Sequence, residues 1–132
     1  MSATPKVKSF VIADQVFQQQ SGKWCIIGVF DRIFSARFPA RHPSLGLYLK
    51  LADAEGKYNV RMELQDATGR VVGRMAGLEL TVQSRVAEPE VGLQTYNLIL
   101  PKEGTYFIKL FFNDEPAQDI KLIASQPGQE DK

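Results

Sequence analysis

A regular alternation of apolar and polar residues is the feature of this sequence that most constrains its fold. Every second residue from Leu45 to Leu51 is a leucine, with Tyr48 and Lys50 among the residues between them. Residues 58–64 repeat the pattern with Tyr, Val, Met and Leu on one side. Because successive side chains of a β-strand point to opposite faces, this spacing buries one face of a strand and leaves the other face in water.

Turn residues separate the alternating runs at short intervals, and no longer stretch has a convincing helical period. Gly56 and Gly69 lie in two of these turns, and Pro101 ends a run because its ring cannot donate to a strand ladder. The sequence therefore predicts an all-β fold: an antiparallel β-sandwich of about eight strands, Ig-like or C2-like, or else an open barrel. The predicted strands cover residues 7–13, 24–30, 45–51, 58–65, 70–75, 78–83, 95–100, 104–112 and 120–124.

A single domain, residues 1–132, accounts for the whole chain. The 132 residues are enough to bury an apolar core, and 44% hydrophobic with 23% charged residues is typical of globular proteins. Residues 1–5 and 125–132 are expected to be flexible tails. The net charge of +1 gives no overall attraction to nucleic acid or to an anionic membrane, so neither is expected as a partner.

The cellular setting predicted from the sequence is the cytoplasm. Cys25 is the only cysteine and cannot form an intramolecular disulfide, whereas small secreted domains usually carry several cysteines. The N-terminal residues contain no apolar signal core, and no apolar stretch is long enough to span a bilayer. These features predict a soluble protein in a reducing compartment.

The predicted strand Trp24–Phe30 differs from the others because it is apolar on both faces. One face carries Trp24, Ile26 and Phe30, and the other carries Cys25, Ile27 and Val29. A strand that is covered on both sides usually lies inside a sheet. We therefore expect this strand at the centre of the fold.

The connection that follows, residues 31–43, is richer in binding residues than a link between two strands requires. It contains three arginines, one histidine, two phenylalanines and two prolines. Arginine and aromatic side chains dominate binding hot spots, and long connections are often functional. The candidate binding residues are Asp31, Arg32, Phe34, Arg37, Phe38, Arg41 and His42. Alternatively, Ile33, Phe34 and Phe38 only seal an open end of the sandwich, with Arg37 and Arg41 along its rim.

A second candidate surface consists of aromatic residues that alternate with predicted core residues. If the leucines of residues 45–51 point inward, Tyr48 points outward, and by the same reasoning Phe107 and Phe111 share an outer face with Lys109. Such a patch is either an interface with a partner, which includes a second copy of the chain, or a face that another part of the chain covers.

The sequence shows no pattern typical of a catalytic, cofactor-binding or metal site. His42 is the only histidine and has no second histidine at a zinc-ligand spacing, while the aspartates near the predicted turns are explained by turn chemistry. Ser21-Gly22-Lys23 lacks the spacing of a phosphate-binding loop. No cofactor and no catalytic residue are therefore predicted. For an enzyme, a carboxylate pair such as Asp31 with Glu63 would be the remaining candidate.

Several stretches of the sequence resemble a family of small, uncharacterised bacterial proteins, a domain of unknown function. The most specific are Gly-Val-Phe-Asp-Arg-Ile at 28–33 and Phe-Pro-Ala-Arg-His-Pro at 38–43, and residues 60–66 and 97–106 add to them. The resemblance spans most of the chain. It implies a bacterial protein and agrees with a β-sandwich, but it implies no activity and no catalytic residues.

The function predicted from these features is that of a non-enzymatic protein–protein interaction module. Its partner would be another protein or a second copy of the chain. The alternative is a domain that binds a small anionic ligand through Arg32, Arg37, Arg41 and His42, because guanidinium groups match the geometry of carboxylates and phosphates.

Overall fold

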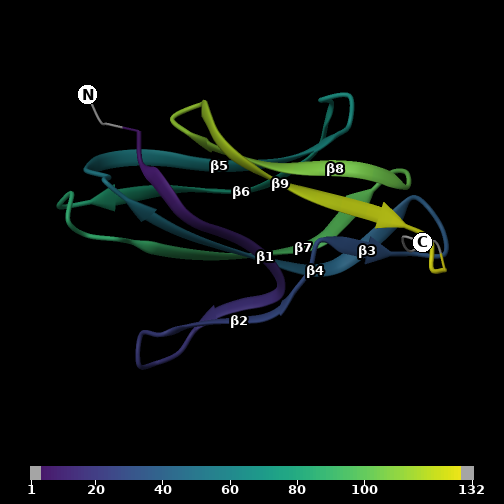
Figure 1. Ribbon diagram of the computed structural model, residues 1–132, viewed down its shortest axis with the longest axis horizontal. Coiled ribbons are helices and arrows are strands. Elements are labelled where there is room, and N and C mark those ends of the chain that lie inside the picture. The colour runs from purple at the N-terminus through teal and green to yellow at the C-terminus, as the bar shows by residue number, and fades with distance from the viewer. Residues whose placement is uncertain (1–3, 129–132) are drawn as a thin grey trace.

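The computed structural model describes residues 4–128, and these residues form strands joined by short turns (Figure 1). Residues 1–3 and 129–132 of the expected tails lie outside the described residues. Ser125, which was expected in the C-terminal tail, is the last residue of a strand. The strands are β1 (Lys6–Gln18), β2 (Trp24–Val29), β3 (Arg32–Phe34), β4 (Ala40–Ala52), β5 (Gly56–Asp66), β6 (Val71–Val82), β7 (Glu90–Leu100), β8 (Gly104–Phe112) and β9 (Glu115–Ser125).

The strands form two sheets that pack face to face (Figure 1). The first sheet has the strand order β2-β1-β4-β7, and the second has the order β3-β9-β8-β5-β6. Neighbouring strands are antiparallel except for β3 and β9, which are parallel. The predicted all-β sandwich is confirmed.

The connection predicted at residues 31–43 is wrong in its extent. A short strand, β3, forms inside it, and β4 begins at Ala40, so that within this segment only Asp31 and residues 35–39 lie outside strands. There are two physical reasons why the sequence pattern does not reveal β3 and the beginning of β4. A strand of three residues is too short to show a period of two, and Pro43 removes a ladder donor from the beginning of β4.

Two further boundaries differ from the sequence-based expectation. The two strands predicted at 70–75 and 78–83 form one strand, β6 (Val71–Val82), whose register against β5 shifts between Arg61 and Met62. Such an irregularity interrupts the alternation, and the sequence pattern therefore suggested two strands. The strand β7 begins at Glu90, inside a segment that lacks clear alternation.

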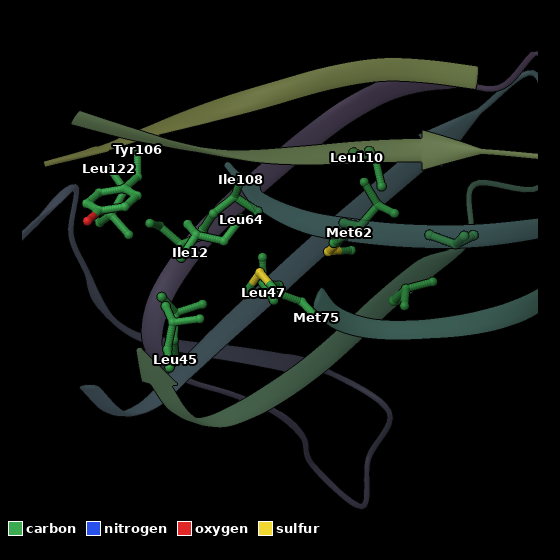
Figure 2. Close-up of a cluster of buried hydrophobic side chains, with 14 of the residues drawn as sticks. Ile12, Leu45, Leu47, Met62, Leu64, Met75, Tyr106, Ile108, Leu110 and Leu122 are labelled. Atoms are coloured by element: carbon green, nitrogen blue, oxygen red, sulfur yellow. The ribbon is translucent and has the colours of Figure 1, made fainter. Parts of the chain in front are cut away.

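The main core lies between the two sheets, as the alternation predicts. The leucines of β4 point into it and meet apolar side chains of β5 and β8 (Figure 2). Burying one such leucine contributes roughly 1.5–3 kcal/mol of transfer free energy. The fully buried residues of this region include Leu45, Leu47, Leu49, Leu51, Val60, Met62, Leu64, Ile108, Leu110 and Leu122.

The β1–β2 hairpin folds back over the outer face of the first sheet. The first half of β1 pairs with β4, and from Ala13 to Gln18 it pairs with β2. Two strand glycines make room for this crossing. A Cβ atom on Gly46 would lie 2.7 Å from the Val16 backbone nitrogen, and one on Gly92 would lie 2.1 Å from the Trp24 ring. The hairpin therefore lies directly on the backbones of β4 and β7.

The side chain of Gln94 holds the point where β1 leaves β4. Its Oε1 accepts a hydrogen bond from the Val16 backbone nitrogen at 3.1 Å. Its Nε2 donates to the Asp14 carbonyl at 3.0 Å and to the Ser44 hydroxyl at 2.6 Å. These bonds satisfy backbone groups that the β4 ladder no longer reaches.

The strand β2 lies at an edge of the first sheet, so the prediction of a central strand is wrong. Trp24 and Ile26 face a second, smaller core cluster, whose buried members are Ala13, Val16 and Tyr48. On the opposite face, Ile27 and Val29 are 50% and 69% exposed. An apolar pattern on both faces cannot distinguish two covered faces from one covered and one exposed face.

Candidate functional site

The first part of the predicted binding segment is fixed to the end of the chain by β3. Ile33 lies opposite Ala124 and Phe34 opposite Ser125 in the parallel ladder with β9. The Ser35 amide donates to the Ser125 carbonyl at 2.9 Å, which extends the pairing by one bond. Because Ile33 is buried in the main core, its neighbour Phe34 points outward and is 46% exposed.

The loop at residues 35–39 presents Arg37 and anchors Phe38. The Ser35 hydroxyl donates to the Arg37 carbonyl at 2.7 Å, which closes a tight turn. Phe38 is partly buried and packs against the main core, whereas Arg37 is exposed. The Phe38–Pro39 peptide bond is cis. Phe38 therefore seals the end of the sandwich, as the alternative interpretation of this segment proposed, and Arg37 remains available to a partner.

The beginning of β4 adds a second exposed arginine. Arg41 pairs with Ile99 of β7 in the ladder, and both side chains are exposed. Along β7 the buried positions change from odd to even numbers: Val91 is buried near the start of the strand, and Leu98 and Leu100 are buried near its end. The residue before Leu98, Asn97, has a φ of 58°. A left-handed residue interrupts the alternation of a strand, and this places Ile99 on the outside.

Arg37 and Arg41 are not neutralised by the rest of the described structure. Within residues 4–128, neither guanidinium forms an ion pair. Residues 31–42 contain three arginines and one aspartate, which gives three minus one, or two net positive charges. An exposed, uncompensated pair of guanidinium groups attracts carboxylates, and it does so most strongly at low salt.

His42 is separated from these arginines by burial. It is partly buried, and its ring centroid lies 5.6 Å from that of Phe30. Its Nε2 is buried and has no hydrogen-bond partner among the described residues. Burial lowers the pKa of His42 below its usual value, although the charge of Asp14 and a hydrogen bond to the Ser44 backbone oppose this shift. His42 is therefore neutral at neutral pH and contributes no positive charge.

The seven predicted binding residues thus fall into two groups. Four of them are exposed and the other three are partly buried. The exposed residues are Asp31, Phe34, Arg37 and Arg41, and the partly buried residues are Arg32, Phe38 and His42. We call Phe34, Arg37, Arg41 and the neighbouring Ile99 the β3–β4 surface. Ile99 was not predicted, because its exposure depends on the irregularity at Asn97.

The three aromatic residues of the second candidate surface do not share a face. Tyr48 is buried beneath the β1–β2 hairpin, where its ring meets Trp24 edge-on at 6.2 Å between centroids. Its hydroxyl bonds to the Glu90 carboxylate, and burial together with this carboxylate raises the pKa of Tyr48 to about 12. Phe107 and Phe111 belong to β8 in the other sheet. The chain itself therefore covers Tyr48.

A charged network occupies the outer face of the second sheet. Glu63 of β5 is only 6% exposed, and its carboxylate accepts hydrogen bonds from Arg61 and from Arg74, the latter at 3.0 Å. The Arg61 guanidinium also lies 4.1 Å from the centre of the Phe111 ring. Glu63 is thus paired with arginines, while Asp31 lies beside Ile123 of β9. The two carboxylates do not form the acid–base pair considered from the sequence.

Three of the depressions in the described structure have no residue of the β3–β4 surface in their lining. Their volumes are about 430, 520 and 330 Å³. The described residues contain no group of three or more His, Cys, Asp or Glu side chains that could hold a metal ion. Among them there is also no helix long and apolar enough to cross a membrane.

Comparisons with known proteins give a family and a fold. Residues 8–125 match the model of a protein family that is described as a family of unknown function. No curated protein is similar to the chain in sequence.

Among solved structures, the chain is similar to part of a β-glucosidase from Listeria innocua. The TM-score is 0.54 at 12% identity for the complex with isofagomine, and 0.52 at 13% identity for the complex with gluconolactone. The alignments cover 92% and 89% of this chain but only 16% of the glucosidase chain. At such low identity this similarity shows the fold alone.

Proposed function

The chain belongs to this family of unknown function, DUF6941, and we propose that it is a non-enzymatic module that binds an acidic segment of another protein through the β3–β4 surface. The observation that carries the proposal is the exposure of two arginines without ion pairs, Arg37 and Arg41, in a segment that also exposes Phe34, with the exposed Ile99 opposite Arg41 in the ladder. Arginine and aromatic residues supply much of the binding energy of protein interfaces.

The shape of this region favours a protein partner over a small anionic ligand. Small ligands are usually bound in concave sites that bury most of their surface. None of the three depressions described above is lined by Phe34, Arg37, Arg41 or Ile99. In addition, His42 is partly buried and neutral, so it adds no positive charge to a shared anion site. A surface with two arginines that line none of these depressions is better suited to an extended acidic segment.

Photo-crosslinking in the native host cell tests the proposal. A photo-reactive amino acid in place of Phe34 is expected to capture a specific partner. The matched control is the same amino acid in place of Val86, which is 89% exposed in the β6–β7 connection at the opposite end of the sheets (Figure 1). A partner captured equally from both positions, or from neither, would contradict a binding role for this surface.

Charge reversal tests the role of the arginines. The double change Arg37→Glu with Arg41→Glu is expected to weaken binding of the captured partner by at least about tenfold, because it replaces attraction to carboxylates by repulsion. Binding to the unchanged protein is also expected to weaken as salt is raised. The matched control is Arg85→Glu, an exposed arginine in the β6–β7 connection. If the double change and Arg85→Glu weakened binding equally, the position of the arginines would not matter, and this would contradict the proposal.

A thermal-shift measurement separates the two classes of ligand. If the surface bound a small anion, phosphate or a dicarboxylate at a hundred times its dissociation constant would add about 2.7 kcal/mol of stability. We expect no shift that depends on Arg37 and Arg41. A shift that the double charge reversal abolished would favour the small-anion alternative.

We also propose that this module works in the cytoplasm of a bacterial cell. The proposal is supported by a single cysteine, Cys25, which is partly buried and not in a disulfide, and by the resemblance to small bacterial proteins. Cell fractionation with an antibody against the chain would test the location, and recovery in a membrane or extracellular fraction would contradict it.

A further inference from the structure

The face of the β1–β2 hairpin that points away from the sheet is apolar and exposed. Phe17 lies opposite Cys25 in the ladder, and Gln15 lies opposite Ile27, so these side chains share one face. Phe17, Ile27 and Val29 are among the most exposed large apolar residues of the described chain. The other face of the hairpin is already in use, because Trp24 and Ile26 pack on the first sheet.

The free edge of β2 carries neither a charged side chain nor a proline, although its strand is short and contains the left-handed Gly28. Proteins usually protect an edge strand with charged side chains or proline. Of the four strands at the ends of the two sheets, β3 carries Arg32, β6 carries Arg74 and Glu79, and β7 carries Glu90. The sequence of β2, Trp-Cys-Ile-Ile-Gly-Val, contains neither a charge nor a proline. This edge is therefore the one best suited to accept another strand.

We propose that β2 pairs with the β2 strand of a second copy of this chain, antiparallel and about a two-fold axis at Ile27. In this register Ile27 meets Ile27 of the second copy, and Cys25 meets its Val29, so the exposed apolar residues of the two hairpins form one continuous patch. Each copy contributes the same residues, as a two-fold interface requires. The two first sheets then join into one sheet with the order β7-β4-β1-β2-β2-β1-β4-β7.

Charge complementarity selects the second copy as the occupant. Lys23 and Asp31 flank β2, both are exposed, and neither forms an ion pair within residues 4–128. Lys23 directly precedes β2 and Asp31 lies two residues beyond its end, so an antiparallel second copy brings the Lys23 end of one β2 to the Asp31 end of the other. The chain thus carries a complementary charge for each end of its own β2.

The interface is small, and the dimer is therefore expected to depend on concentration. Two short strands bury less area than a standard protein interface. The pairing does not involve Phe34, Arg37, Arg41 or Ile99, so it is independent of the proposed function. Changes at those residues are expected to leave the dimer unchanged, and this makes failure of one proposal distinguishable from failure of the other.

Light scattering coupled to size exclusion measures the association. The unchanged protein is expected to approach twice the 14.8 kDa of one chain as its concentration is raised. Ile27→Lys is expected to shift it to a monomer, because two like charges would meet at the axis. Val86→Lys, which also places a lysine at an exposed apolar position, is the matched control and should still dimerise. A monomer at all concentrations, or a dimer that Ile27→Lys leaves intact, would overturn the proposal.

Disulfide trapping tests the register. In a Cys25→Ser background, Ile27→Cys is expected to form a cross-linked dimer under mild oxidation, because residues directly opposite across paired strands lie within disulfide range. Phe17→Cys in the same background lies on the neighbouring strand and is expected to remain free. Each variant has a single cysteine at an exposed position on the same face of the hairpin, so their reactivity is comparable. Equal cross-linking of the two variants, or none at Ile27→Cys, would overturn a pairing centred on Ile27.

Discussion

Individual residues determine how closely the β1–β2 hairpin can approach the first sheet. Gly46 and Gly92 lie where the β1–β2 hairpin crosses the first sheet, and a Cβ atom at either position would collide with the crossing chain. At the two glycines the absence of a side chain matters, whereas at His42 a polar side chain is itself partly buried. Its Nε2 has no hydrogen-bond partner among the described residues. A protonated, charged ring would lose its hydration at this site without a compensating bond, so the site favours the neutral ring.

The burial of His42 predicts a loss of stability in mild acid. Because folding lowers its pKa, the folded state binds fewer protons than the unfolded state as the pH falls through 6.5. The free energy of unfolding that this site contributes is thus fully present above that pH and decreases below it. Urea unfolding of the unchanged protein and of His42→Gln between pH 7.5 and pH 5 measures the difference. The dependence on pH should be smaller in His42→Gln, and equal slopes would show that His42 is not the responsible group.

Among the elements, the β1–β2 hairpin is a layer added to the outside of a two-sheet sandwich. It is held by the Gln94 hydrogen bonds, by the cluster around Tyr48 and by the contact of Trp24 with Gly92. These contacts bury fewer side chains than the main core. We therefore expect the hairpin to be the less stable of the two packed regions.

Gly92→Ala is expected to loosen the hairpin. The new methyl group would lie 2.1 Å from the Trp24 ring, so the ring has to move, at a typical cost of about 1–3 kcal/mol for overpacking. Trp24 is the only tryptophan, and its fluorescence therefore reports on the hairpin. The matched control is Gly73→Ala in β6, where a Cβ atom would lie 3.7 Å from Leu64 at an ordinary contact distance. Equal urea midpoints for the two variants would contradict a tight contact at Gly92.

At the scale of the whole molecule, stability comes from the core between the two sheets. Leu47 of β4 is buried among residues of both sheets (Figure 2). Leu47→Ala is expected to cost about 2–5 kcal/mol, because a cavity would remain in a core that opposing sheets hold apart. Circular dichroism and Trp24 fluorescence during urea unfolding measure this loss. A cost below 1 kcal/mol would mean that the sheets close around the missing side chain.

The sequence predicted the all-β sandwich because its regular strands bury only one face. Leu45–Leu51 is such a strand, and its leucines lie in the core as expected. The errors occur where pairing or irregularity decides the outcome. Whether β2 lies at an edge depends on strands far away in the sequence, and β3 is too short to have a pattern. The exposure of Arg37 and Arg41 agrees with both interpretations of their segment. The exposure of Ile99 follows from the backbone at Asn97, which alternation does not show.

The parallel pairing of β3 with β9 has a consequence for the order in which the protein is made. A chain that emerges from the ribosome beginning at its N-terminus has β3 available long before its neighbour, because the paired residues are 91 positions apart, from Arg32 to Ile123. The first sheet can assemble once β7 has emerged, but β3 has no strand beside it until β9 follows. The segment that carries Phe34 and Arg37 therefore cannot reach its final position before β9 has been made.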